Sequence, residues 1–81
     1  MHVTIRLFAR LRELAGAPDL NRELPEGSTA RDAWNALIAE FPAMADYTRA
    51  ISCAVNEDYA RLTAALKDGD EVAFLPPVSG G

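Results

Sequence analysis

Residues 71–81 read E-V-A-F-L-P-P-V-S-G-G and join an apolar run to a tail of proline and glycine. The apolar run over 71–75 is rich in residues that favour β-strands, so it predicts the last strand of the fold. Pro76 and Pro77 end this strand, because neither has a backbone N–H to donate to a neighbouring strand. The sequence therefore predicts a folded domain over 1–75.

The remaining residues, 76–81, are predicted to form a flexible C-terminal tail. Fully extended, they would reach about 20 Å beyond the sheet. The prolines are followed by Val78, Ser79, Gly80 and Gly81. The two glycines have no side chain, so they could enter a narrow channel that leads to a buried site. A stiff spacer, a thin tip and a terminal carboxylate are typical of a carrier arm, but a frayed chain end has a similar composition, so both interpretations stay open.

Length and composition limit the classes of protein to which the chain can belong. Its 81 residues predict one small domain, and 49% apolar with 25% charged residues is ordinary for a globular protein. A net charge of −4 argues against nucleic acid and anionic membranes as partners, because both attract clusters of Lys and Arg. The sequence contains no run of about 20 apolar residues and no signal-peptide pattern, so we expect a soluble cytoplasmic protein.

At the other end of the chain, residues 2–8 show the period-two pattern of a strand with one buried face. Val3, Ile5 and Leu7 lie on that face, whereas Phe8 falls on the polar one. The other predicted elements are a short helix over 9–16 that stops at Gly16, strands over 19–24 and 51–56, an edge strand over 59–62, and a tight turn over 67–70 with Gly69 at positive φ.

The most regular pattern predicts a helix that begins at a cap provided by Ser28 or Thr29. Asp32 lies three residues after Thr29, close to the spacing and chemistry of a capping box. Apolar residues at helical spacing then form one continuous stripe: Ala30, Ala33, Trp34, Leu37, Ile38 and Phe41. Pro42 ends the helix, and 43–50 reads as a loop or a loose helical turn. One sheet packed on one main helix is an α+β fold.

Motifs for independent catalysis are absent from the sequence. It has no phosphate-binding glycine loop, no Cys/His cluster for a metal, and one histidine, His2, near a chain end that we expect to fray. Cys53, the single cysteine, lies among apolar residues without a neighbouring cation, which favours a small buried side chain over a reactive thiol. We therefore expect no bound metal or cofactor and a protein on which other enzymes act.

Three blocks of the sequence carry a specific resemblance. They are F-A-R-L-R-E-L-A-G at 8–16, A-V-N-E at 54–57 and D-G-D-E-V-A-F-L-P-P-V-S-G-G at 68–81. Together they resemble the small, sulfur-carrying subunit of molybdopterin synthase from one end of the chain to the other. That family has the ubiquitin-like β-grasp fold. The resemblance therefore implies a mixed sheet of four to five strands on one main helix, with the first and last strands adjacent and parallel.

The resemblance also implies a role for the tail. A partner similar to ubiquitin-activating enzymes uses ATP to adenylate the carboxylate of Gly81, and a sulfur donor then displaces AMP to leave a thiocarboxylate. The tail enters the large subunit of molybdopterin synthase and gives its sulfur to the cyclic pterin precursor of the molybdenum cofactor. The chain is then a sulfur-donor subunit without catalysis of its own, in a complex of two carriers and two large subunits. The family's tail maps onto Pro76, Pro77, Val78, Ser79 and Gly80.

The same analogy assigns the faces of the sheet. The buried residues of the first and last strands should face the main helix, which leaves Phe8, Ala73 and Leu75 on the opposite face near the tail. We expect these three residues to bind the large subunit, and we call them the docking patch. The alternative is that they are ordinary exposed apolar residues, which are common on protein surfaces.

Other functions stay compatible with the sequence. The related sulfur carrier of thiamin thiazole synthesis also ends in two glycines, but it is usually shorter and lacks the helical insert at 9–16. Further alternatives are a sulfur carrier for thiolated-nucleoside synthesis, a ubiquitin-like modifier whose Gly81 is joined to lysines of other proteins, and a β-grasp binding module without tail chemistry.

Overall fold

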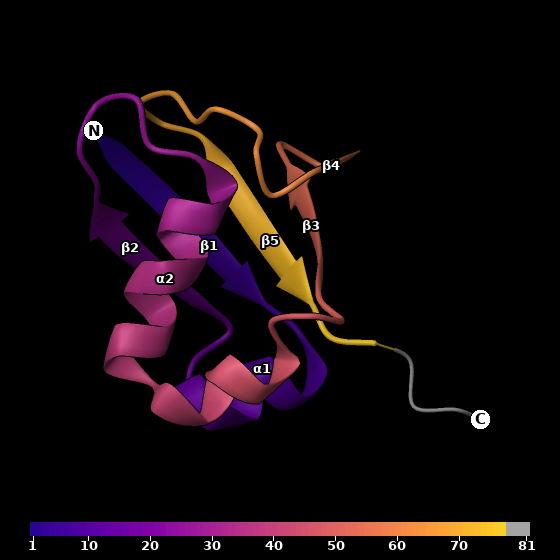
Figure 1. Cartoon of the computed structure of the whole chain (residues 1–81). Coiled ribbons are helices and arrows are strands. Elements are labelled where there is room, and N and C mark those ends of the chain that lie inside the picture. Colours follow the sequence, from indigo (N-terminus) through magenta and orange to yellow (C-terminus); the bar gives the residue numbers. More distant parts are fainter. Residues whose placement is uncertain (78–81) are drawn as a thin grey trace.

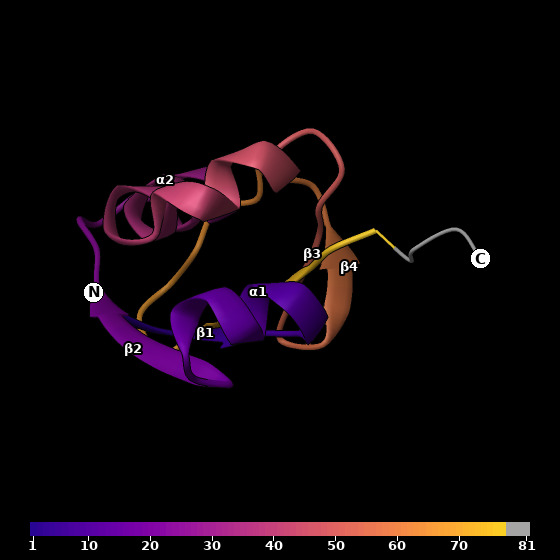
Figure 2. The same ribbon diagram turned by 90° about the horizontal axis from the view of Figure 1, so that it is seen from below.

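A computed structural model describes residues 1–77 of the chain, and its elements are labelled in Figure 1. In chain order they are β1 (His2–Leu7), α1 (Ala9–Ala15), β2 (Asp19–Glu23), α2 (Ala30–Glu40), the 3-10 helix η1 (Pro42–Tyr47), β3 (Ser52–Val55), β4 (Asp58–Ala60) and β5 (Glu71–Leu75). Figure 2 shows α2 lying over one face of the sheet, and Figure 1 places α1 at the end where β1 and β5 finish. We call the sheet face opposite α2 the outer face.

The sheet formed by residues 1–77 has five strands in the order β2-β1-β5-β3-β4. The first and last strands, β1 and β5, are parallel neighbours at its centre, where Ile5 lies opposite Val72. The other three pairs of neighbouring strands are antiparallel. Because β1 is the first strand of the described chain and β5 the last, their pairing brings distant parts of the sequence together around one core. The α+β fold and the β-grasp arrangement expected from the sequence are confirmed.

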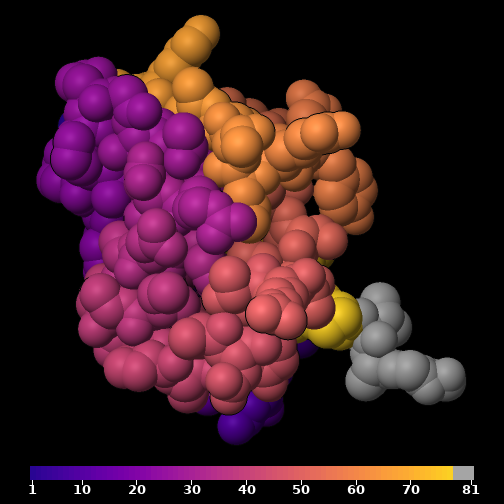
Figure 3. Space-filling model, in the orientation of Figure 1, coloured from indigo at the N-terminus to yellow at the C-terminus, as the bar shows by residue number. Residues whose placement is uncertain are grey.

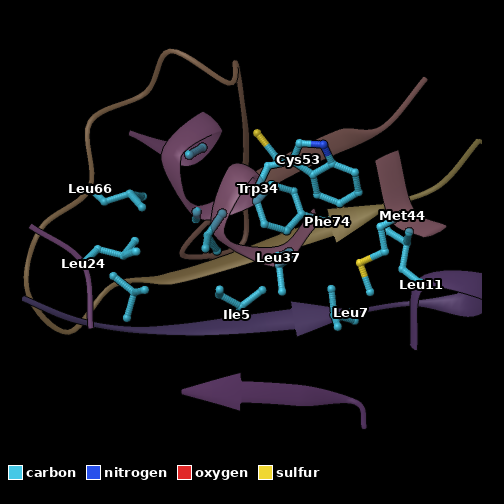
Figure 4. Packing of buried hydrophobic residues seen from close by; sticks show 14 residues of the cluster. Ile5, Leu7, Leu11, Leu24, Trp34, Leu37, Met44, Cys53, Leu66 and Phe74 are labelled. Carbon is cyan, nitrogen blue, oxygen red and sulfur yellow. The ribbon is translucent and has the colours of Figure 1, made fainter. Parts of the chain in front are cut away.

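The core lies between the sheet and α2, where Figure 4 shows the buried side chains. Val3, Ile5 and Leu7 are buried, as the period-two pattern predicted, and so is Leu37 of the helical stripe. Trp34 is fully buried, and its indole Nε1–H donates to Thr48 Oγ1 at 2.9 Å, so the ring has no unpaired polar atom. The prediction that Trp34 belongs to the core is confirmed.

Thr29 rather than Ser28 caps α2. Its hydroxyl oxygen accepts from the backbone N–H of Asp32 at 3.3 Å, and the Asp32 carboxylate accepts from the Thr29 N–H at 2.8 Å. This reciprocal pair is the predicted capping box. The Ser28 hydroxyl instead donates to the Pro25 carbonyl at 2.7 Å, which fixes the turn before the helix.

Two glycines adopt the left-handed conformation that the sequence predicts for them. Gly16 has φ 75° and ends α1, donating its N–H to the Arg12 carbonyl. Gly69 has φ 87° in the turn before β5, and its N–H donates to the His2 carbonyl at 2.7 Å. The backbone N–H of His2 in turn donates to Asp68 Oδ1 at 2.7 Å. The expectation that the chain would fray at His2 is therefore wrong, because this turn binds it on both sides.

The edge strand β4 differs from its prediction, since it spans Asp58–Ala60 rather than 59–62. The Leu62 carbonyl accepts from the backbone N–H of Arg31, in the first turn of α2, and is not paired in the sheet. A helix start has free N–H groups that need such acceptors, so the helix competes with the sheet for this segment. The segment after α2, for which the sequence predicts a loop or a loose helical turn, is the 3-10 helix η1.

Candidate functional site

The last strand fixes the point at which the chain leaves the domain. Val72 and Phe74 are fully buried towards α2, whereas Ala73 and Leu75 lie half-buried on the outer face. β5 ends at Leu75, directly before Pro76, as the sequence predicted. Figure 3 shows the yellow residues that follow β5 at the molecular surface, beside the segment that carries η1. The root of the tail is thus anchored by a buried strand.

The predicted tail residues are only partly within the described chain. Pro76 is half-buried and Pro77 exposed, and neither belongs to a helix or strand. The predictions for Val78, Ser79, Gly80 and Gly81 lie outside the described residues.

The outer face carries a row of residues that the strand register places side by side. Arg6 lies opposite Ala73, Ala73 opposite Ala54, and Ala54 opposite Tyr59, so the row crosses β1, β5, β3 and β4. The phenol of Tyr59 is 82% exposed. Successive side chains of a strand point to opposite faces, so this row turns away from the core.

The structure brings the three residues of the docking patch together. Phe8 (37% exposed), Ala73 and Leu75 line one shallow hollow of the outer face, with Ala54 and Tyr59 beside them. We call this the sheet hollow. Its charged lining residues are Arg6, Glu57 and Glu71. The hollow is therefore an apolar surface with a few charges, as protein-binding surfaces often are.

One cation orders the aromatic ring of the docking patch. The Arg6 guanidinium lies 5.6 Å from the centroid of the Phe8 ring and 3.2 Å from Glu71 Oε1. A cation over an aromatic face is attracted by the ring's negative π-surface. Phe8 lies at the junction of β1 and α1, where it has extended backbone and precedes the helix, and Arg6 lies over its ring.

A second hollow lies at the root of the tail. Its lining includes Phe8, Arg10, Tyr47, Leu75, Pro76 and Pro77. Phe8 and Leu75 belong to both hollows. The docking patch is thus continuous with Pro76 and Pro77, the residues that directly follow β5.

Part of this site is not indicated by local sequence patterns. The sequence predicts Tyr59 in an edge strand but not the face on which it lies, and no pattern assigns a role to Glu57 or Arg6. The available signal is the pair Asn56-Glu57 between two strands, since a two-residue turn sets Ala54 opposite Tyr59. Once that register is known, Tyr59 falls on the same face as Ala73.

The other candidate groups have structural roles. Cys53 is buried, its Sγ lies 3.2 Å from the Ala60 carbonyl oxygen, and burial raises the pKa of its thiol. The prediction of a buried, unreactive cysteine agrees with this placement.

Across residues 1–77 no three His, Cys, Asp or Glu side chains are grouped closely enough to bind a metal ion. In the same part of the chain, no helix has the length and apolar character needed to cross a bilayer.

Comparison with known proteins shows the family to which this chain belongs. The model of the ThiS family matches residues 5–81. The molybdopterin synthase sulfur carrier subunit of Arabidopsis thaliana is 38% identical over 81 residues, which cover 100% of this chain and 84% of the relative.

Two solved structures extend the comparison to the fold. The crystal structure of SAMP1, small archaeal modifier protein 1, from Haloferax volcanii has a TM-score of 0.85 at 33% identity and covers 100% of both chains. A complex of subunits 1 and 2 of the molybdopterin-converting factor of Helicobacter pylori contains a chain with a TM-score of 0.68, 24% identity and 100% coverage of both chains, a likeness of fold alone. This chain therefore belongs to the ThiS family, and it groups with the ubiquitin-like sulfur carrier subunits of molybdopterin synthase.

Proposed function

We propose that this chain is the sulfur carrier subunit of a molybdopterin synthase and carries its sulfur as a thiocarboxylate on Gly81. The observation that carries the proposal is the similarity to named sulfur carrier subunits over the whole length of the chain. The geometry supports it, because a strand with buried residues ends directly before Pro76, and neither Pro76 nor Pro77 belongs to the sheet.

The chemistry requires activation by a partner. A carboxylate is a poor electrophile until one oxygen becomes part of a good leaving group. The Gly81 carboxylate attacks the α-phosphorus of ATP in the activating enzyme, and pyrophosphate leaves. A sulfide-level nucleophile such as hydrogen sulfide then attacks the carbonyl carbon of the acyl-adenylate, the bond to AMP breaks, and loss of the S–H proton gives the thiocarboxylate. Since the sequence has no phosphate-binding loop, the nucleotide is bound by a partner similar to ubiquitin-activating enzymes.

Delivery of the sulfur uses the division into a domain over 1–75 and a tail over 76–81. The tail enters the large synthase subunit, where the thiocarboxylate sulfur acts as a nucleophile towards the cyclic pterin precursor. The chain contributes the donor group and performs no catalysis itself. In the Helicobacter pylori molybdopterin-converting factor, a chain of the same fold belongs to a complex of subunits 1 and 2, which supports a second, larger subunit as the partner.

Docking of the large subunit is assigned to Phe8, Ala73 and Leu75. These residues share one hollow, and Phe8 and Leu75 also line the hollow at the tail root, so binding there directs the tail towards the partner. A partner that covers these side chains removes their exposed apolar surface from water, which stabilises the complex by about 25 cal/mol per Å² of apolar area.

A second candidate function is protein modification. It is favoured by the likeness to small archaeal modifier protein 1, which is 34% identical over 94% of this chain and 97% of that relative. In this case the activated Gly81 carbonyl is attacked by a lysine amine of another protein, AMP leaves, and an amide bond joins the two chains. Both functions begin with the same acyl-adenylate.

Intact-mass spectrometry separates these functions. The chain is incubated with ATP, a sulfur donor and a lysate of its own organism, which supplies the activating enzyme and the proteins that a modifier would be joined to. A sulfur carrier gains the mass difference between sulfur and oxygen, a modifier gains the mass of a target protein, and a chain that gains neither contradicts both. A variant without Gly81 is the control, and it should gain neither mass if the reaction takes place on Gly81.

A thiol-reactive label gives an independent readout. A terminal thiocarboxylate should react in the native protein, whereas Cys53 is buried. A Cys53→Ala variant that is still labelled after activation assigns the label to the C-terminus.

A further inference from the structure

Glu57 has a backbone conformation that its side chain disfavours. Val55 pairs with Asp58, so only Asn56 and Glu57 connect β3 to β4. Their φ angles are 50° and 72°. Two positive φ angles in a two-residue hairpin loop define a type I′ turn, whose second position strongly prefers glycine.

The two turn residues differ in what compensates this strain. Asn56 tolerates positive φ, its amide Nδ2 donates to Asp70 Oδ1 at 3.0 Å, and its Oδ1 accepts from the Glu71 N–H at 3.0 Å. Glu57 has no side-chain hydrogen bond or ion pair with any residue of the described chain, 1–77. Left-handed backbone costs a residue with a side chain roughly 1–2 kcal/mol, so the fold holds Glu57 at a cost that no side-chain hydrogen bond or ion pair within residues 1–77 offsets.

Glu57 lies beside the exposed apolar residues of the outer face. It lines the sheet hollow together with the docking patch and the exposed Tyr59. The other two charged residues of this hollow, Arg6 and Glu71, are paired with each other at 3.2 Å. Glu57 therefore contributes the uncompensated negative charge beside an apolar surface. Residues held in strained backbone conformations concentrate at binding sites, where the strain positions a functional group.

We infer that Glu57 is a recognition residue for a protein partner that presents an arginine or lysine next to the apolar side chain that fills the sheet hollow. This inference rests on the proposed function, in which the partner is the large synthase subunit. The carboxylate pairs with the partner's cation as the hollow is covered. Because such a pair lies at the edge of an interface, it acts mainly on association rate and partner selection.

Two substitutions separate charge from strain. Glu57→Gln keeps the side-chain size and the backbone conformation but removes the charge. We expect it to leave the melting temperature unchanged and to weaken binding of the full chain to the large synthase subunit about fivefold at low ionic strength, and less at high salt. Glu57→Gly relieves the strain, so it should raise the melting temperature while weakening binding to the same extent. A gain in stability with a loss of affinity is not expected of a residue with a structural role.

Glu26→Gln is the matched control. Glu26 is also an exposed turn glutamate, but it lines a different hollow with Leu24 and Ser28. Its variant should bind the large subunit as the original chain does, although the net charge changes equally.

The outcomes are distinguishable. Unchanged affinity of Glu57→Gln, equal weakening by Glu26→Gln, or an unaltered melting temperature of Glu57→Gly would each overturn the inference while the proposed function stands. If the original chain itself fails to bind the large subunit, the proposed function fails and the inference fails with it.

Discussion

The ring of Trp34 in α2 packs against the ring of Phe74 in β5, with centroids 5.1 Å apart and planes inclined by 57°. Both side chains are fully buried. Tilted aromatic pairs of this kind contribute about 0.5–1.5 kcal/mol beyond the burial of their area. Since Phe74 comes two residues before Pro76, this contact joins the main helix to the strand from which the tail departs.

Phe74→Ala should destabilise the domain strongly. Removal of a fully buried Phe leaves a cavity and costs about 3–5 kcal/mol, a large share of the roughly 5–15 kcal/mol by which small domains are stable. Urea unfolding followed by the fluorescence of Trp34, the single tryptophan, measures this change. Tyr59→Ala is the control, because the 82% exposed Tyr59 should alter the stability by no more than about 0.5 kcal/mol. Equal effects of the two variants would contradict the packing described for Phe74.

Local sequence patterns predicted most of the fold. The alternation of Val3, Ile5 and Leu7 predicted a strand with one buried face, and the Thr29 and Asp32 pair predicted the start of α2. Both signals depend on neighbours a few residues apart, so they can be read from a single sequence. The signal for the start of the tail is equally local, because β5 ends where proline removes the backbone N–H donor.

The remaining features depend on residues far apart in the chain. The Arg6–Glu71 pair joins positions 65 apart, and it forms only after β1 and β5 have paired in the correct register. The early end of β4 reflects competition, because the Leu62 carbonyl accepts from the first turn of α2. The sequence therefore predicts that Phe8, Ala73 and Leu75 share the outer face, whereas the positions of Tyr59 and Glu57 beside them require the register of the sheet.

Asp70 should make stability depend on pH in the acid range. Asn56 Nδ2 donates to Asp70 Oδ1 at 3.0 Å and the Lys67 N–H donates to Oδ2 at 2.8 Å, and these bonds lower the pKa of Asp70. A carboxyl with a lowered pKa in the folded state contributes stability above its ordinary pKa of about 3.9, and the contribution is lost as the pH falls through the lower folded value.

At pH values below about 4, the urea concentration at the midpoint of unfolding should therefore decrease. Asp70→Asn should make this decrease smaller. Asp46→Asn, a change of an exposed aspartate in η1, is the control. The assignment is wrong if both variants keep the pH profile of the original chain.

Cys53 should react slowly with alkylating reagents in the native protein. The thiol is 2% exposed, and burial raises its pKa, so little thiolate is available near neutral pH. Labelling with iodoacetamide, followed by intact mass, should be slower by roughly a hundredfold or more in the folded chain than in urea, because the thiol reacts only after the structure opens. Rapid labelling without urea would show that β3 opens far more easily than its position between β5 and β4 implies.

Leu75→Glu should abolish binding to the large synthase subunit while the domain stays folded. Leu75 is half-buried on the outer face and lines both hollows, so a carboxylate there places an unpaired charge at the centre of the proposed interface. Burial of an unpaired charge costs several kcal/mol, enough to weaken binding by more than about a hundredfold. Titration of the full chain with the large subunit measures this effect, and thermal unfolding checks that the variant is folded.

Ala39→Glu is the control, because it adds the same charge to the exposed surface of α2, on the other side of the sheet, and should bind normally. If Leu75→Glu and Ala39→Glu bind equally well, Phe8, Ala73 and Leu75 are ordinary exposed apolar residues and the partner uses another surface.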